Sequence, residues 1–82
     1  MILYLVNDDV KCIDTSDIIS VDIITDRKHK NYFDIYVTDK NQSYRFYSIS
    51  YATGYDRKEC IDEIRGNLIK NFCIEENKIR VS

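Results

Sequence analysis

The chain has 82 residues, of which 44% are hydrophobic and 32% are charged, and its formal net charge is −2 at pH 7. This balance is typical of a folded globular protein, and it excludes a disordered chain, which would be poorer in apolar residues. Acidic and basic residues are scattered rather than blocked, so the charge pattern does not favour nucleic acid or anionic lipid as a partner. We expect one small α+β domain over residues 1–82.

The cellular compartment is predicted from the apolar runs and the cysteines. Apolar runs reach only about five residues, so we expect neither a signal peptide nor a membrane-spanning helix. Cys12, Cys60 and Cys73 fit neither a disulfide framework nor a zinc-binding pair, and we expect three free thiols on or near apolar faces. We therefore predict a cytoplasmic protein. The many isoleucines, lysines and asparagines indicate an AT-rich gene of a low-GC bacterium, a phage or another mobile element.

The first half of the chain is predicted to form strands. Residues 2–6 and 10–13 flank a polar turn at residues 7–9, which indicates a hairpin. Residues 18–25 then alternate, and we expect Ile19, Val21 and Ile23 to face the core. Residues 26–31 carry no apolar periodicity and are predicted to form an exposed loop.

The next two predicted strands carry four of the seven tyrosines. Over residues 32–38 the apolar side chains of one parity face inward, which leaves Tyr32 and Tyr36 on the outer face. Residues 43–50 do not keep one phase, because Tyr44 and Phe46 share one parity and Tyr47 has the other. A β-bulge near Phe46 and Tyr47 would place both sets on one face; without it, one set is exposed.

Residues 56–72 are predicted to form an amphipathic helix. Asp56 and Glu59 have the spacing of a capping box, in which the Asp56 side chain accepts from the Glu59 amide. Apolar residues then recur three and four positions apart, as expected of a helix that packs one face on a sheet. Gly66 destabilises the helix by about 1 kcal/mol relative to alanine, and either permits close approach of another element or is tolerated.

Residues 78–81 are predicted to form a last strand. The resulting order is five strands, one helix and one strand, in a mainly antiparallel twisted sheet of five to six strands packed on the C-terminal helix. The link from the helix to the last strand is the one place where a parallel neighbour is expected. The predicted core consists of Leu3, Leu5, Ile19, Val21, Ile23, Phe33, Ile35, Val37, Ile61, Ile64, Leu68 and Phe72.

Catalysis is not expected, since the only histidine, His29, lies in a basic loop and the sequence has no glycine-rich phosphate loop. One histidine and three distant cysteines also give no metal-ligand pair, so no cofactor is predicted. A weaker alternative is an enzyme or sensor in which Cys60 or Cys12 reacts.

The leading hypothesis is a non-enzymatic protein-binding module, because tyrosine and arginine supply contact area and hydrogen bonds at protein interfaces. Small size and AT-rich composition suggest a phage or mobile-element protein that inhibits a host protein, for example a defence nuclease. The candidate partner-binding residues are Tyr32, Tyr36, Arg45, Tyr47, Arg27, Lys28, Lys30 and Tyr55.

Two other partners stay open on the sequence. A sheet face that carries tyrosines beside a basic loop could bind a single-stranded nucleic acid by stacking, although Asp34 lies on the same face. The last strand could also pair with a second copy at the edge of the sheet and form a homodimer. No membrane partner is expected.

Overall fold

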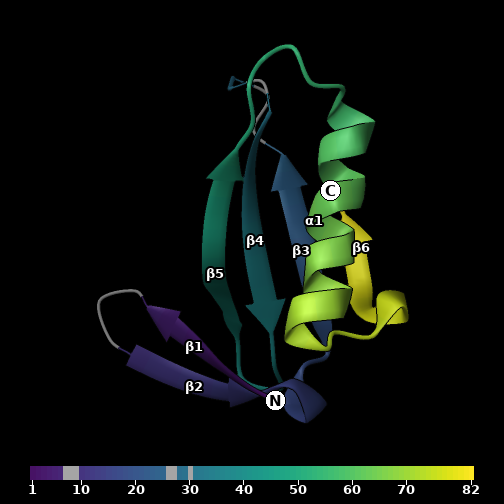
Figure 1. Ribbon diagram of the computed structural model, residues 1–82. Coiled ribbons are helices and arrows are strands. Elements are labelled where there is room, and N and C mark those ends of the chain that lie inside the picture. Colours follow the sequence, from purple (N-terminus) through teal and green to yellow (C-terminus); the bar gives the residue numbers. More distant parts are fainter. Residues whose placement is uncertain (7–9, 26–27, 30) are drawn as a thin grey trace.

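The computed structural model describes residues 1–6, 10–25, 28–29 and 31–82, and these form an α+β fold. One α-helix lies across one face of a four-stranded sheet, and a separate hairpin lies beside one edge of that sheet (Figure 1). The elements are β1 (Ile2–Val6), β2 (Val10–Asp14), the 3-10 turn η1 (Thr15–Asp17), β3 (Ser20–Thr25), β4 (Tyr32–Thr38), β5 (Ser43–Ser50), α1 (Arg57–Phe72), the 3-10 turn η2 (Glu76–Lys78) and β6 (Ile79–Val81).

The predicted order of five strands, one helix and one strand is confirmed, but the strands do not form one sheet. β1 and β2 pair only with each other, and the larger sheet has the order β5-β4-β3-β6 among the described residues. Leu3, Leu5 and Ile13 of the hairpin join the common core, so apolar packing rather than backbone pairing holds the hairpin there. The predicted turn at residues 7–9 lies outside the described residues.

β6 is the parallel neighbour that the helix link allows. Val21 of β3 lies opposite Ile79 of β6, and the two strands run in the same direction. The chain leaves β5 at one edge of the sheet, passes along α1 and returns at the other edge, as parallel pairing requires of a crossover connection. α1 thereby covers the sheet between its two edge strands (Figure 1).

The expected β-bulge in β5 is present. Ile35 lies opposite Tyr47 and Tyr36 lies opposite Arg45, so Phe46 is the extra residue between the two pairs. A bulge of this kind shifts the strand by one residue and reverses the side on which later side chains lie. Tyr44, before the bulge, and Tyr47, after it, therefore both pack against the core under α1.

The core is centred on β4 and on the helix. β4 buries alternate residues and leaves the intervening ones half-buried, and α1 contributes Cys60, Ile64 and Leu68. Ile61 and Phe72, expected in the core, pack against its edge. The buried apolar residues are Leu3, Leu5, Ile13, Ile18, Val21, Ile23, Phe33, Ile35, Val37, Cys60, Ile64, Leu68, Ile74 and Ile79.

The assignment of Ile19 to the core is wrong. Ile19 is 59% exposed, whereas Ile18 is 2% exposed. The reason is that the η1 turn lies directly before Ile18, and the strand begins only at Ser20. The period-2 pattern of β3 therefore does not extend back to Ile19, and the turn directs the preceding isoleucine inward instead.

The start of α1 also differs from the expected capping box. Asp56 precedes the helix with extended backbone, but its side chain makes no capping hydrogen bond. The helix start is held from outside by Asn31, whose Nδ2 donates to the carbonyl oxygens of Ala52 and Tyr55 at 3.0 Å each. Asn31 adopts φ 60°, in the left-handed region that asparagine tolerates better than most residues.

The cysteines are free thiols, as predicted, but only one of them is buried. Cys60 packs in the core, while Cys12 and Cys73 are exposed. Cys73 ends α1 in the left-handed conformation at φ 55°, and the next residue, Ile74, is buried and donates its N–H to the Leu68 carbonyl at 3.1 Å. The position of Cys73 therefore follows from how the helix ends and not from its apolar character.

Replacing Leu68 with alanine tests the helix-on-sheet core. Leu68 is fully buried, so the variant should lose about 2–5 kcal/mol of unfolding free energy, measured by urea denaturation. Ile69→Ala on the same helix is the control, because Ile69 is 37% exposed and should lose far less. Equal losses in the two variants would contradict the described packing.

Replacing Asn31 with alanine tests the clamp on the start of α1. Asn31 is 5% exposed, and its loss leaves two carbonyl acceptors without their donor, so we expect about 1–3 kcal/mol of destabilisation. Amides of the segment between β5 and α1 should also exchange faster with deuterium. Asn77→Ala, at an exposed position, should leave both the stability and the exchange unchanged.

Candidate functional site

The face of the four-stranded sheet opposite α1 is the candidate site, and we call it the open face. No described helix or strand lies against it (Figure 1). All of its β5 side chains are exposed, whereas the β5 side chains on the helix side are half-buried. By strand register it consists of Ser20, Asp22, Ile24, Tyr32, Asp34, Tyr36, Thr38, Ser43, Arg45, Ser48, Ser50 and Arg80.

Most polar groups on the open face are already paired. The Arg80 guanidinium donates to both carboxylate oxygens of Asp22, at 2.9 and 3.1 Å, and to the Ser20 hydroxyl at 3.2 Å. Hydrogen bonding to Asp22 and its charge raise the pKa of Arg80. Asp34 accepts a hydrogen bond from the Ser48 hydroxyl. Asp22, Asp34 and Arg80 are therefore all bonded to neighbouring side chains.

Arg45 and Tyr36 are the exception. They lie directly opposite each other on neighbouring strands, and Arg45 is exposed. Within the described part of the chain, Arg45 makes no ion pair, and the Tyr36 hydroxyl makes no side-chain hydrogen bond. The two side chains therefore offer a guanidinium and a phenol without side-chain partners among the described residues, Tyr36 on the inner strand β4 and Arg45 on the edge strand β5.

The four strands carry two arginines and two aspartates, and all four lie on the open face. The face is consequently neutral. A face of zero net charge gives little attraction to a phosphate backbone, because affinity for nucleic acid grows with the number of phosphates that are neutralised.

The structure brings together only some of the predicted site residues. Tyr32, Tyr36 and Arg45 share the open face, and the Tyr32 ring contacts the His29 ring edge-on at 6.3 Å between centroids. Lys28, next to His29 in sequence, is exposed. Arg27 and Lys30, which were predicted to complete a basic edge, lie outside the described residues.

Tyr47 and Tyr55 are not on the open face. The bulge at Phe46 turns Tyr47 to the helix side, where its ring packs near Phe72. Tyr55 is 55% exposed and contacts Tyr51 edge-on, in the segment that leads to α1. Of the four candidate tyrosines, Tyr32 and Tyr36 therefore lie on the open face, whereas Tyr47 and Tyr55 do not.

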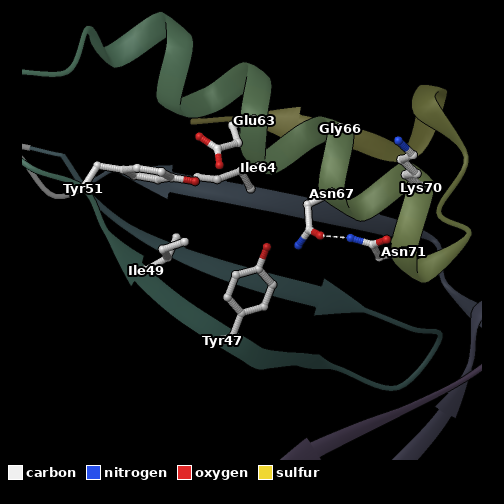
Figure 2. A pocket seen from close by; sticks show the side chains of 9 residues that line it. All are labelled: Tyr47, Ile49, Tyr51, Glu63, Ile64, Gly66, Asn67, Lys70 and Asn71. Atoms are coloured by element: carbon white, nitrogen blue, oxygen red, sulfur yellow. Dashed lines mark hydrogen bonds between the residues drawn. The ribbon is translucent and has the colours of Figure 1, made fainter.

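A pocket of about 420 Å³ lies on the helix side, between β5 and α1 (Figure 2). The sheet side of the pocket is formed by Tyr47, Ile49 and, just beyond β5, Tyr51. The helix side is formed by Glu63, Ile64, Gly66, Asn67, Lys70 and Asn71.

The surroundings raise the pKa of two phenols of this pocket. Burial raises the pKa of Tyr47, and the neighbouring Asn67 side chain opposes the rise. Burial, followed by the negative charge of Glu63, raises the pKa of Tyr51. The Tyr47 hydroxyl oxygen is buried and makes no hydrogen bond of ordinary geometry with the described residues.

Sequence reasoning missed Arg80 and the pocket. Arg80 comes from a three-residue strand far along the chain, and nothing in its local pattern indicates that it pairs with Asp22. Gly66, which lines the pocket, was expected either to permit close approach of another element or to be tolerated in the helix. A Cβ at Gly66 would have no atom within 4 Å, so no element approaches it closely.

The described residues show neither a metal site nor a membrane-spanning helix. They contain no group of three or more histidine, cysteine, aspartate or glutamate side chains placed to hold a metal ion. None of the described helices has the length and apolar character needed to cross a membrane. Comparison of the chain with protein-family models, with curated proteins and with solved structures finds no match.

Proposed function

We propose that this protein is a non-enzymatic binding module that docks a protein partner on the open face of its four-stranded sheet. The observation that carries the proposal is the pair of Tyr36 and Arg45, which lie opposite each other on β4 and β5 without partners among the described side chains. Tyrosine and arginine are the residue types over-represented among those that dominate binding energy at protein interfaces.

The surroundings of this pair suit a protein surface. Asp22 and Arg80 form a bidentate ion pair on one side of Tyr36. The hydrogen bond between Asp34 and Ser48 lies at the next outward-facing pair of positions along β4 and β5. A partner that covers Asp22 and Arg80 buries a compensated pair of charges rather than a lone charge, which would weaken binding. The partner is expected to place a carboxylate against Arg45, because Arg45 is the cation of the face that has no ion-pair partner among the described residues.

A single-stranded nucleic acid is the runner-up partner. Tyr32 and Tyr36 would supply rings for base stacking. The neutral open face argues against it, since Asp22 already engages Arg80. The homodimer, the cytoplasmic location and the narrower prediction of a phage protein that inhibits a host protein stay predictions; the identity of the bound partner tests the last of these.

Capture from a lysate of the source organism, with and without nuclease, tests the partner class. We expect a stoichiometric protein that survives nuclease treatment. Tyr36→Ala and Arg45→Ala should each weaken its binding about tenfold or more, as expected at an interface hot spot. Tyr4→Ala and Lys58→Ala are the matched controls, because both residues are exposed away from the open face.

Two results would contradict the proposal. Unchanged affinity of both open-face variants, with melting temperatures near that of the wild type, would show that the partner binds elsewhere. Recovery of nucleic acid alone, with binding that falls steeply as salt is added, would establish the runner-up instead.

A further inference from the structure

The pocket between β5 and α1 lies on the opposite side of β5 from Tyr36 and Arg45, so it is separate from the proposed docking surface. Its volume of about 420 Å³ falls within the range of small-molecule sites, which is about 300–1,000 Å³. Apolar side chains of Ile49 and Ile64 are combined in it with phenol, amide and charged groups (Figure 2). Such a mixture is typical of sites that hold and orient a small polar molecule.

Gly66 is the first sign that the space is used. Glycine destabilises a helix interior by about 1 kcal/mol relative to alanine, and here neither backbone nor packing requires it. Gly66 has no positive φ, and a Cβ there would meet nothing within 4 Å. The consequence of this glycine lies in the pocket. Between Glu63 and Asn67, Ile64 is the one residue that lines the helix side of the pocket with a side chain.

The middle of the pocket is lined with hydrogen-bond donors. The buried Tyr47 hydroxyl points toward α1 at Asn67 (Figure 2). Asn71 donates to the Asn67 carbonyl oxygen, which leaves the Asn67 amide nitrogen on the side of Tyr47. A phenol and an amide NH₂ that converge in this way suit an acceptor such as a carboxylate.

The other end of the pocket is electronegative. Glu63 lies over Tyr51, whose hydroxyl points along the pocket toward Ile64 (Figure 2). A carboxylate beside aromatic rings favours an organic cation. Glu63 and Asn67 are one helical turn apart, about 6 Å along the axis at 1.5 Å per residue.

We infer that this pocket binds a small zwitterion of the ω-amino-acid type, with its ammonium group at Glu63 and Tyr51, its carboxylate at Tyr47 and Asn67, and its methylene chain on Ile49 and Ile64. The ligand is a free small molecule that needs both charges, separated by about one turn of helix. Its binding does not depend on the protein partner proposed for the open face.

Titration with 5-aminopentanoate, followed by ¹H–¹⁵N NMR, tests the inference. Pentanoate and pentylamine are the matched probes, because each keeps the chain and only one of the two charges. We expect saturable shifts of the Tyr47, Tyr51 and Asn67 amides with 5-aminopentanoate, and binding about tenfold or more weaker with either single-charge probe.

Three variants locate the site. Glu63→Gln should weaken 5-aminopentanoate binding about tenfold or more, and Asp62→Asn, at an exposed neighbour outside the pocket, should not change it. Gly66→Leu should abolish binding because its side chain enters the pocket. This variant should melt at or above the wild-type temperature, because leucine favours helix over glycine.

Any of three outcomes would overturn the inference: no saturable shift with 5-aminopentanoate, equal binding of pentylamine and 5-aminopentanoate, or undiminished binding to a folded Gly66→Leu variant. Capture of the protein partner is measured on separate variants, so failure of this experiment leaves the proposed function standing, and the reverse is also true.

Discussion

The packing of α1 on β4 is the interaction on which the rest of the structure depends. β4 is paired on both sides, and its Phe33, Ile35 and Val37 are almost completely buried. Ile64 and Leu68 of the helix lie in the same core. A chain of this length buries a smaller fraction of its surface than a larger domain does, so a single helix-on-sheet contact must supply much of the apolar burial.

This packing also divides the molecule into two chemically different sides. Helix and hairpin bring their apolar residues to one face of the sheet, and the other face keeps every charged residue of the four strands. Arg80 illustrates the effect, because it joins β3 only after the chain has crossed the sheet through α1, and it then pairs with Asp22. The crossover thus neutralises one half of the open face and leaves Arg45 as the unpaired cation in the other half.

The bulge at Phe46 links the two sides. Before it, Arg45 lies on the open face opposite Tyr36, and after it, Tyr47 lies on the helix side opposite Ile35. Because of this one extra residue, the residues proposed to bind a protein and the residues that line the pocket lie on opposite sides of β5. Without the bulge, Tyr47 and Ile49 could not lie on the same side of β5 as Tyr44.

Local patterns in the sequence determined the elements and much of the core. The alternation in residues 32–38 placed Phe33 inside and Tyr36 outside, because a strand turns successive side chains to opposite faces whatever its neighbours are. The phase break in residues 43–50 likewise required a bulge or an exposed aromatic set. The placement of Ile19 failed because the η1 turn, which has no apolar period, changes the phase just before the strand begins.

Only the tertiary structure decided which elements are neighbours. Strand pairing, the separate hairpin, the contact of Arg80 with Asp22 and the clamp of Asn31 on Ala52 and Tyr55 all join residues distant in sequence. Nothing in a local period encodes such pairs, since they follow from how the assembled sheet and helix bring side chains together. For the same reason the local alternation placed Tyr36 outside, whereas only the fold assigned Tyr47 to a pocket.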